Sequence, residues 1–140
     1  MTNHSLAQSY FWKASKRLRI LQVLLEEKSY SDVVREAQEL VELALKGMLR
    51  QVGIEPPKWH DVGSILMENG SRFPEEISSK IEELAAISQW LRNEREFSFY
   101  GDVDFIPTEE YTEAEAQRAL ADARKVLSIA SAIIPLHDPL

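Results

Sequence analysis

Apolar side chains recur every three or four positions over four long stretches of the chain, a spacing typical of helices that bury one face. The stretches cover residues 6–28, 30–52, 74–100 and 112–134. The second has the widest apolar face, so we expect its helix at the centre. Alternating apolar and polar runs long enough for strands are absent. The pattern predicts an all-α, up-and-down bundle of four to five helices, forming one domain over residues 1–140.

Residues that favour helix ends support three of these boundaries. Ser29 and Asp32 resemble a capping pair before the second helix, and Gly53 is a natural stop after it. Pro74 suits the first position of the third helix, because proline has no backbone N–H to pair there. We therefore expect the third helix to run without a break from about residue 74 to residue 100.

The connections between the long helices also have a readable pattern. The two prolines at 56 and 57 exclude helix, and a short helical turn is expected over residues 61–68, capped by Asp61. Residues 102–111 are expected to form a loop. Thr112 and Glu115 match a capping box, so the last helix should begin there.

Composition narrows the possible chemistry. The absence of cysteine removes disulfides, thiolate metal sites and cysteine nucleophiles. The histidines at positions 4, 60 and 137 lack the spacing of metal ligands, so we expect no metal and no cofactor. Neither a secretory signal nor an apolar run of about 18 residues is seen, which predicts a cytoplasmic protein that does not enter a membrane.

The net charge of −7 argues against tight, sequence-independent binding to long nucleic acid, because such binding depends on neutralising phosphates. A local basic cluster is still present near the N-terminus, at Lys13, Lys16, Arg17 and Arg19. A solvated helix face remains an alternative interpretation of that cluster.

The end of the third helix is the most unusual stretch. Its core stripe runs through Leu91, and the next positions in phase are Arg95 and Ser98. An arginine that points inward needs a partner, because a buried unpaired charge is costly. The partner could be a carboxylate such as Asp102 or Asp104, the carbonyl end of a neighbouring helix, or a phosphate. An internal salt bridge, a ligand site and plain solvent exposure all remain open.

A second polar cluster follows the two prolines. Trp59 could plug the end of the bundle while Asp61 caps the short helix, or His60 and Asp61 could line the same cleft as the arginines. Together the two clusters give the candidate ligand-binding residues. These are Arg92, Asn93, Arg95, Tyr100, His60 and Asp61.

Four motifs, in order along the chain, resemble the HEPN domain family. They are the runs ELVELALKGML at 39–49, GIEPPKWHDVG at 53–63, LRNEREFSFYGD at 91–102 and YTEAEA at 111–116. The resemblance implies a four- or five-helix bundle that is usually dimeric. Some members are metal-independent RNases and toxins paired with a small nucleotidyltransferase antitoxin, and others bind nucleotides or act as non-catalytic partners.

The nuclease members have an arginine followed a few residues later by a histidine, and two copies of this motif meet across the dimer. Arginine would stabilise the charge on the phosphate, and histidine would move protons near neutral pH. Here the histidine would follow Arg92 at Phe97, Ser98 or Phe99, or follow Arg95 at Tyr100. Tyrosine, with a reference pKa of about 10, is a poor base at neutral pH, although it can donate to a phosphate or stack on a base.

Three functions remain open, and no catalytic residue is assigned. The favoured one is a non-catalytic or weakly active HEPN module that binds nucleotide or RNA phosphate. It would act as a homodimer beside a nucleotidyltransferase, in a toxin–antitoxin-like system. The second is a metal-independent RNase that uses Tyr100 or His60. The third is a protein-interaction scaffold that uses its tryptophans, Trp12, Trp59 and Trp90.

Overall fold

Four long helices form the body of the molecule: α1 (Asn3–Glu26), α2 (Tyr30–Gln51), α5 (Ile81–Phe99) and α7 (Glu113–Ser131). The computed structural model describes the backbone of residues 3–56, 58, 61–103 and 105–135, and the side chains of residues 5–56, 58, 61–94, 100–103 and 105–135. Short helices fill the connections: α3 (Val62–Glu68), a 3-10 turn at Gly70–Arg72, α4 (Glu75–Ser78) and α6 (Pro107–Glu110). The predicted all-α bundle is confirmed.

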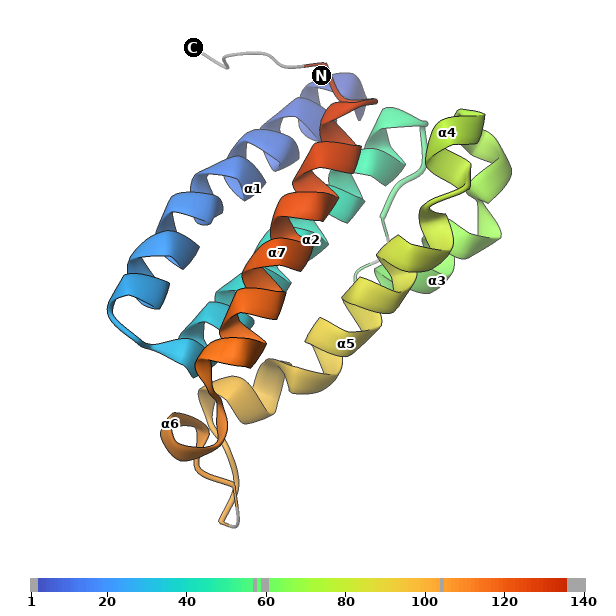
Figure 1. Ribbon diagram of the computed structural model, residues 1–140. Coiled ribbons are helices and arrows are strands. Elements are labelled where there is room, and N and C mark those ends of the chain that lie inside the picture. The colour runs from blue at the N-terminus through green and yellow to red at the C-terminus, as the bar shows by residue number, and fades with distance from the viewer. Residues whose placement is uncertain (1–2, 57, 59–60, 104, 136–140) are drawn as a thin grey trace.

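The helix α2 is central, as its wide apolar face predicts. It packs against α1, α7 and α5, while α1 also packs against α7. Figure 1 shows α1 and α5 at opposite edges of the bundle, with α2 and α7 between them. Twelve residues of α2 are buried, and most of them are apolar. Burial of each large apolar side chain contributes about 1.5–3 kcal/mol, so this helix anchors the fold.

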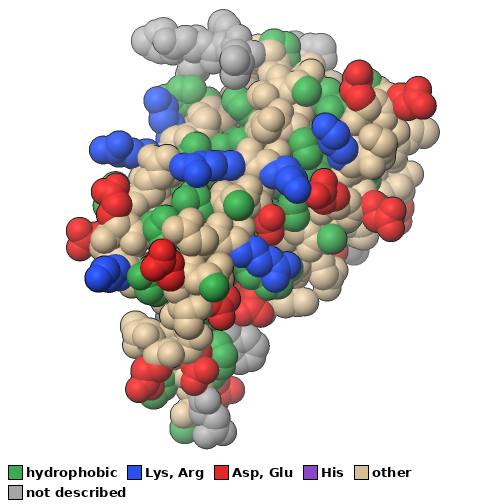
Figure 2. All heavy atoms as spheres, in the orientation of Figure 1, with side chains coloured by type: hydrophobic (Ala, Val, Ile, Leu, Met, Phe, Trp, Pro, Cys, Tyr) green, Lys and Arg blue, Asp and Glu red, His purple; other side chains and the backbone are tan. Residues whose placement is uncertain are grey.

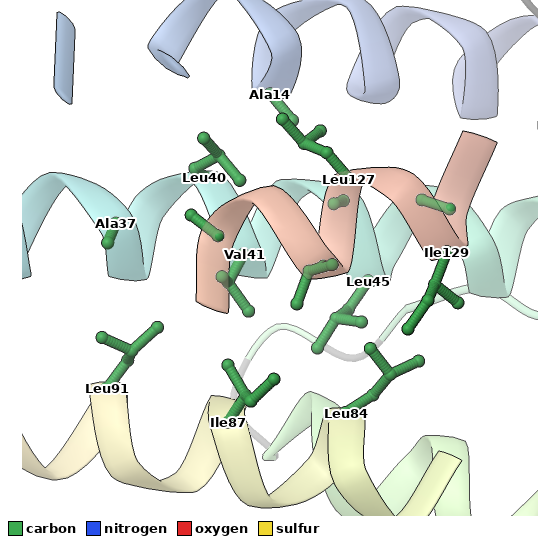
Figure 3. Close-up of a cluster of buried hydrophobic side chains, with 14 of the residues drawn as sticks. Ala14, Ala37, Leu40, Val41, Leu45, Leu84, Ile87, Leu91, Leu127 and Ile129 are labelled. Atoms are coloured by element: carbon green, nitrogen blue, oxygen red, sulfur yellow. The ribbon is translucent and has the colours of Figure 1, made fainter. Parts of the chain in front are cut away.

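The core is formed where the four long helices meet (Figure 3). Fully buried leucines from two of them, Leu45 of α2 and Leu84 of α5, point toward each other, and Ile87 and Leu91 follow along α5. Half of the eight buried positions of α7 are alanines, including Ala119 and Ala123. Small side chains bring backbones close together, so α7 lies tightly over α2 and α1.

The ends of α2 partly match the expected caps. The hydroxyl of Ser29 donates to Oδ2 of Asp32 at 2.7 Å, so the pair forms between side chains and does not cap the backbone. Gly53 ends the helix with φ of 85°, a left-handed conformation that glycine adopts without strain. The amide of Ile54 then donates to the Leu49 carbonyl at 2.9 Å, which completes the stop.

The expectation of one unbroken third helix is wrong. A single turn, α4, begins after Pro74, which lies just before the helix, and α5 starts afresh at Ile81. The hydroxyls of Ser78 and Ser79 donate back to the carbonyls of Glu75 and Glu76 at 3.3 and 3.1 Å. At the break the backbone tightens, because the amide of Lys80 donates to the carbonyl of Ile77, three residues back, at 2.9 Å.

The expected loop over residues 102–111 is also not entirely a loop, because it contains the single turn α6. Pro107 lies at the start of this turn, a position at which proline is favoured. Before it, the backbones of Asp102 and Phe105 pair through two hydrogen bonds of 2.8 and 3.0 Å. Gly101 makes this turn possible, since a Cβ there would collide with the Phe105 carbonyl.

The last helix begins as its sequence predicts. The backbone N–H of Thr112 and its hydroxyl both donate to the carboxylate of Glu115, the first at 3.2 Å. The hydrogen bond from Thr112 lowers the pKa of Glu115. The helix α7 follows directly, from Glu113.

Candidate functional site

Arg92 lies late in α5, and its guanidinium is held toward α2. Its Nη1 is 3.6 Å from Oε1 of Glu42, and its side chain is 38% exposed. This separation is longer than the roughly 2.7–2.9 Å of a strong charge-assisted hydrogen bond. Partly exposed ion pairs of this kind contribute about 0–1 kcal/mol. The internal partner of Arg92 is therefore a carboxylate on α2. The expected partner of Arg95, a carboxylate such as Asp102 or Asp104, stays a prediction, because the Arg95 side chain lies outside the described residues.

Glu42 does not belong to Arg92 alone. Its Oε2 lies 3.6 Å from Nζ of Lys46, one turn further along α2. Its Oε1, which faces Arg92, also accepts a 3.2 Å hydrogen bond from Nε2 of Gln38, one turn earlier. One carboxylate is thus shared by two cations and an amide.

Gln38 connects this cluster to the interior. Its side chain is only 2% exposed, and its Oε1 receives no hydrogen bond from the described residues. A buried polar atom without a partner carries a free-energy cost, so Gln38 makes the fold less stable than full pairing of its amide would. On the same helix, Arg35 and Glu39 form a 2.6 Å ion pair. Charged side chains thus follow one line along α2, from Arg35 to Lys46, and Arg92 of α5 meets this line at Glu42.

For the other predicted residues on and after α5, the structure gives exposure or backbone conformation. Asn93 follows Arg92 and is exposed. The backbone of Arg95 is helical, but its side chain lies outside the described residues. Tyr100 is 76% exposed, just past the end of the helix. We keep all three as members of a candidate site whose centre is Arg92.

Tyr111 ties the following loop to the same part of α5. Its Oη donates a 2.6 Å hydrogen bond to Oε1 of Glu94, two residues after Arg92. Burial and this hydrogen bond raise the pKa of Tyr111 well above its usual value of 10.0. Its ring also packs edge to face on Phe105, with centroids 5.6 Å apart. The segment after α5 is thereby anchored beside the candidate site.

The structure describes only part of the second predicted cluster, which follows the two prolines. His60 and Trp59 lie outside the described residues, as does Asp104, so the idea that His60 approaches the arginines stays a prediction. Asp61 acts as the helix cap that was expected, because its Oδ1 accepts from the Gly63 amide at 3.1 Å. The helix α3 that it starts packs on α5.

Residues that the sequence alone did not single out complete the site. Glu42, Glu94 and Tyr111 all act across helices that are far apart in the chain. A signal for Glu42 did exist, because Gln38, Glu42 and Lys46 recur every four residues as a polar line on the central helix. Among the described residues no group of three or more histidines or carboxylates could hold a metal ion. In the same part of the chain, no helix has the length and apolarity needed to cross a membrane.

The fold and the site together define an all-α bundle whose central helix carries a charged line beside an arginine of a neighbouring helix. A model of the HEPN domain family matches residues 7–133, which is most of the chain. The chain therefore belongs to the HEPN domain family, as its four motifs predict.

Two similar proteins support this assignment. The candidate toxin MJ1304 of Methanocaldococcus jannaschii is 27% identical over 134 residues, which cover 91% of this chain and 87% of that protein. The crystal structure of TT1696 from Thermus thermophilus superimposes with a TM-score of 0.73 at 25% identity, covering 90% of this chain and 96% of that one. The match to TT1696 therefore extends over nearly the whole of both chains.

Proposed function

We propose that this HEPN module binds the phosphate of a nucleotide or of RNA at the end of α5, and that Arg92 is the main contact. The observation that carries this proposal is the weak restraint on Arg92. Its guanidinium is partly exposed, and its carboxylate partner lies 3.6 Å away and is shared with Lys46. An arginine held in this way can exchange the carboxylate for a phosphate, because its planar fork fits both anions.

Three further residues extend the proposed site. Asn93 adjoins Arg92 on the exposed side of α5. Arg95 follows Arg92 by three residues, a spacing at which two positions are neighbours on the surface of a helix. Tyr100 is exposed at the helix end, where its ring could stack on a base. His60 and Asp61 remain candidate contributors from the connector before α3.

The proposal is of binding without efficient cleavage. RNA cleavage by the 2′-hydroxyl needs a group that moves protons near neutral pH. The positions at which the family's nuclease motif would place histidine hold Phe97, Ser98, Phe99 and Tyr100. An arginine alone stabilises phosphate charge but does not take up a proton, because its pKa is above about 12.

The cellular setting that we propose is a toxin–antitoxin-like system. A similar protein of Methanocaldococcus jannaschii is named as a candidate toxin. HEPN toxins of this type pair with a small nucleotidyltransferase, which we propose as the protein partner of this chain. The module would act there as a homodimer in the cytoplasm.

A thermal-shift titration with ATP, GTP and a short single-stranded RNA tests the binding. At about a hundredfold excess over Kd, a ligand stabilises the folded state by about 2.7 kcal/mol, a rise of several degrees in Tm. The rise should appear in the wild type, be abolished in Arg92→Ala and be weakened in Arg95→Ala.

The matched control is Arg124→Ala, an exposed arginine of α7, and it should keep the whole rise. An absence of any shift in the wild type with all three ligands would contradict the proposal. A shift that survives Arg92→Ala would move the site elsewhere.

The alternative function, a metal-independent RNase, is tested by an RNA cleavage assay that again uses Arg92→Ala. Incubation of the protein with RNA in excess chelator should leave the RNA intact under our proposal. Cleavage that Arg92→Ala abolishes would instead identify an active nuclease, and Tyr100→Phe would then show whether the phenol takes part. Cleavage that both variants retain would indicate a contaminating nuclease.

A further inference from the structure

A short arm connects α5 to α7 and projects beyond one end of the bundle, at the bottom of Figure 1. We call residues 100–111 the α5–α7 arm, and α6 lies within it. Tyr100, Val103 and Ile106 of the arm are 76%, 92% and 49% exposed. They are three of the seven large hydrophobic residues that are exposed in the described chain, and they fall within seven consecutive positions. Exposed apolar side chains that gather in this way are typical of a surface that contacts another molecule.

Local contacts hold the arm in one shape although its apolar side chains are exposed. Gly101 has φ of 74°, a conformation that other residues rarely adopt. The backbones of Asp102 and Phe105 pair, and Oδ1 of Asp102 accepts a hydrogen bond from the backbone N–H of Val103. At the other end of the arm, the ring of Tyr111 packs on Phe105. A surface that is fixed in advance loses little conformational entropy on binding, so this arm is suited to contact a partner.

The arm and its flanks carry the whole net charge of the protein. Residues 96–117 contain seven of the 23 acidic residues and none of the 16 lysines and arginines, so the rest of the chain is balanced. The seven are Glu96, Asp102, Asp104, Glu109, Glu110, Glu113 and Glu115.

The carboxylates of the arm are not neutralised internally. None of the ion pairs among the described residues involves Asp102, Glu109 or Glu110. In Figure 2, acidic side chains gather at the lower end of the face shown, and no basic side chain lies among them. The exposed apolar residues therefore lie in a strongly negative field.

We propose that the α5–α7 arm binds a basic partner protein. An apolar pocket of that protein would cover Val103 and Ile106, and a rim of lysine and arginine side chains would meet the carboxylates around them. An apolar centre within a polar, charge-complementary rim is the usual composition of a protein interface.

The charge of the arm decides between the classes of partner. RNA and an anionic membrane surface carry phosphates of the same sign as the arm, so both would be repelled. The same arm of a second copy would be repelled for the same reason, since seven acidic residues would meet seven others. A basic protein surface combines favourable charge with burial of the apolar side chains.

Binding at the arm is independent of phosphate binding at Arg92. Val103, Ile106, Glu109 and Glu110 do not belong to the proposed phosphate site, whereas Tyr100 does, so Tyr100 stays unchanged in the tests. Either binding activity can therefore fail without the other.

Selection from a random peptide library displayed on phage, with the full chain as the target, tests the chemistry of the partner. The selected peptides should combine apolar residues with several lysines or arginines. One of these peptides, made synthetically, should bind the wild type in a calorimetric titration and bind more weakly as salt is added. Selected peptides without basic residues, or a failure to select any peptide, would overturn the proposal.

The double variant Val103→Ser, Ile106→Ser tests the apolar contact. It should weaken binding of the selected peptide at least about tenfold, because two apolar side chains are no longer buried. The fold should be kept, since Val103 is almost fully exposed and Ile106 precedes α6, a position at which serine is favoured. An unchanged urea midpoint would verify this. Met67→Ser, 52% exposed on α3, is the control and should bind as the wild type does. Full binding by the double variant would overturn the proposal.

A second pair of variants separates the local charge of the arm from the net charge of the protein. Glu109→Lys with Glu110→Lys, on α6, should weaken binding of the selected peptide and reduce its dependence on salt. Glu75→Lys with Glu76→Lys is the matched control, because these exposed glutamates also form the first turn of a short helix next to a proline, and α4 lies at the other end of α5. This control should retain wild-type binding, and equal weakening by the two pairs would overturn the assignment to the arm.

Discussion

Arg92 and Glu42 form an ion pair in which each side chain is also open to other interactions. Glu42 lies close to Lys46 and accepts from Gln38 as well, while Arg92 is partly exposed to solvent. Because an incoming phosphate must compete with Glu42 for the guanidinium, this carboxylate sets the affinity of the proposed site.

Glu42→Gln should therefore increase affinity for nucleotide or short RNA by several fold, because the competing negative charge is removed and the amide can still fill the space. Stability should change by less than about 1 kcal/mol, the usual limit for a partly exposed pair. Isothermal titration calorimetry would measure the affinity. A loss of binding would show instead that Glu42 positions Arg92 and does not compete with the ligand.

Tyr111→Phe should destabilise the fold by about 1 kcal/mol, because the hydrogen bond to Glu94 is lost from a buried phenol. Urea denaturation would measure the effect. Tyr30→Phe is the matched control and should be neutral, because the hydroxyl of Tyr30 makes no hydrogen bond with the described residues. Equal effects of the two changes would contradict the structural role given to Tyr111.

The raised pKa of Tyr111 adds a pH dependence with a defined sign. The folded state holds the phenol proton more tightly than the unfolded chain, whose tyrosines titrate near 10.0. This contribution to stability is complete below pH 10 and is lost as the pH rises above it. The wild type should therefore lose more stability above pH 10 than Tyr111→Phe, and parallel stability curves for the two would contradict the assignment.

Of the individual residues at the site, the sequence predicted some roles and left others unseen. The cap at Asp61 was predictable because a cap acts within three residues of itself. The polar line through Glu42 is visible in the sequence, but its pairing with Arg92 was not predictable, and neither was that of Tyr111 with Glu94. These pairings depend on how α2, α5 and the following loop are rotated against one another. Periodicity reports which face of a helix is buried, but not which helix lies against that face.

The elements themselves were largely predictable from their periodicity. There are two exceptions, the single turn α6 and the break before α5. The apolar pattern hides the break because Ile77, Ile81 and Leu84 stay in register and are all buried. The shorter backbone hydrogen bond at Lys80 is a local change that a burial pattern does not report.

A close approach between α3 and α5 gives an element-scale prediction. A Cβ on Gly63 would lie 3.1 Å from Cα of Ala85, closer than ordinary packing allows. Gly63→Leu should therefore push α3 away from α5 and cost about 1–3 kcal/mol. Gly70→Leu is the control, since nothing lies within 4 Å of a Cβ there. Similar urea midpoints for the two variants would contradict this packing.

The net charge of −7 limits how the whole molecule can bind RNA. A site centred on Arg92 and Arg95 would neutralise about two phosphates, and each contributes about 0.7 to the salt slope for single strands. The logarithm of the binding constant should thus fall with a slope of about −1.4 against the logarithm of salt. Fluorescence anisotropy with a short RNA would measure it, and a slope of about −3 or steeper would point to a larger basic surface.

The most direct test of the central claim is a proton–nitrogen NMR titration that follows the arginine side-chain Nε–H signals as short RNA is added. The Arg92 signal should move progressively and saturably, while the Arg124 signal, from the exposed face of α7, should stay in place. An unmoved Arg92 signal, with other arginines shifting in its stead, would contradict the claim that the end of α5 is a phosphate site.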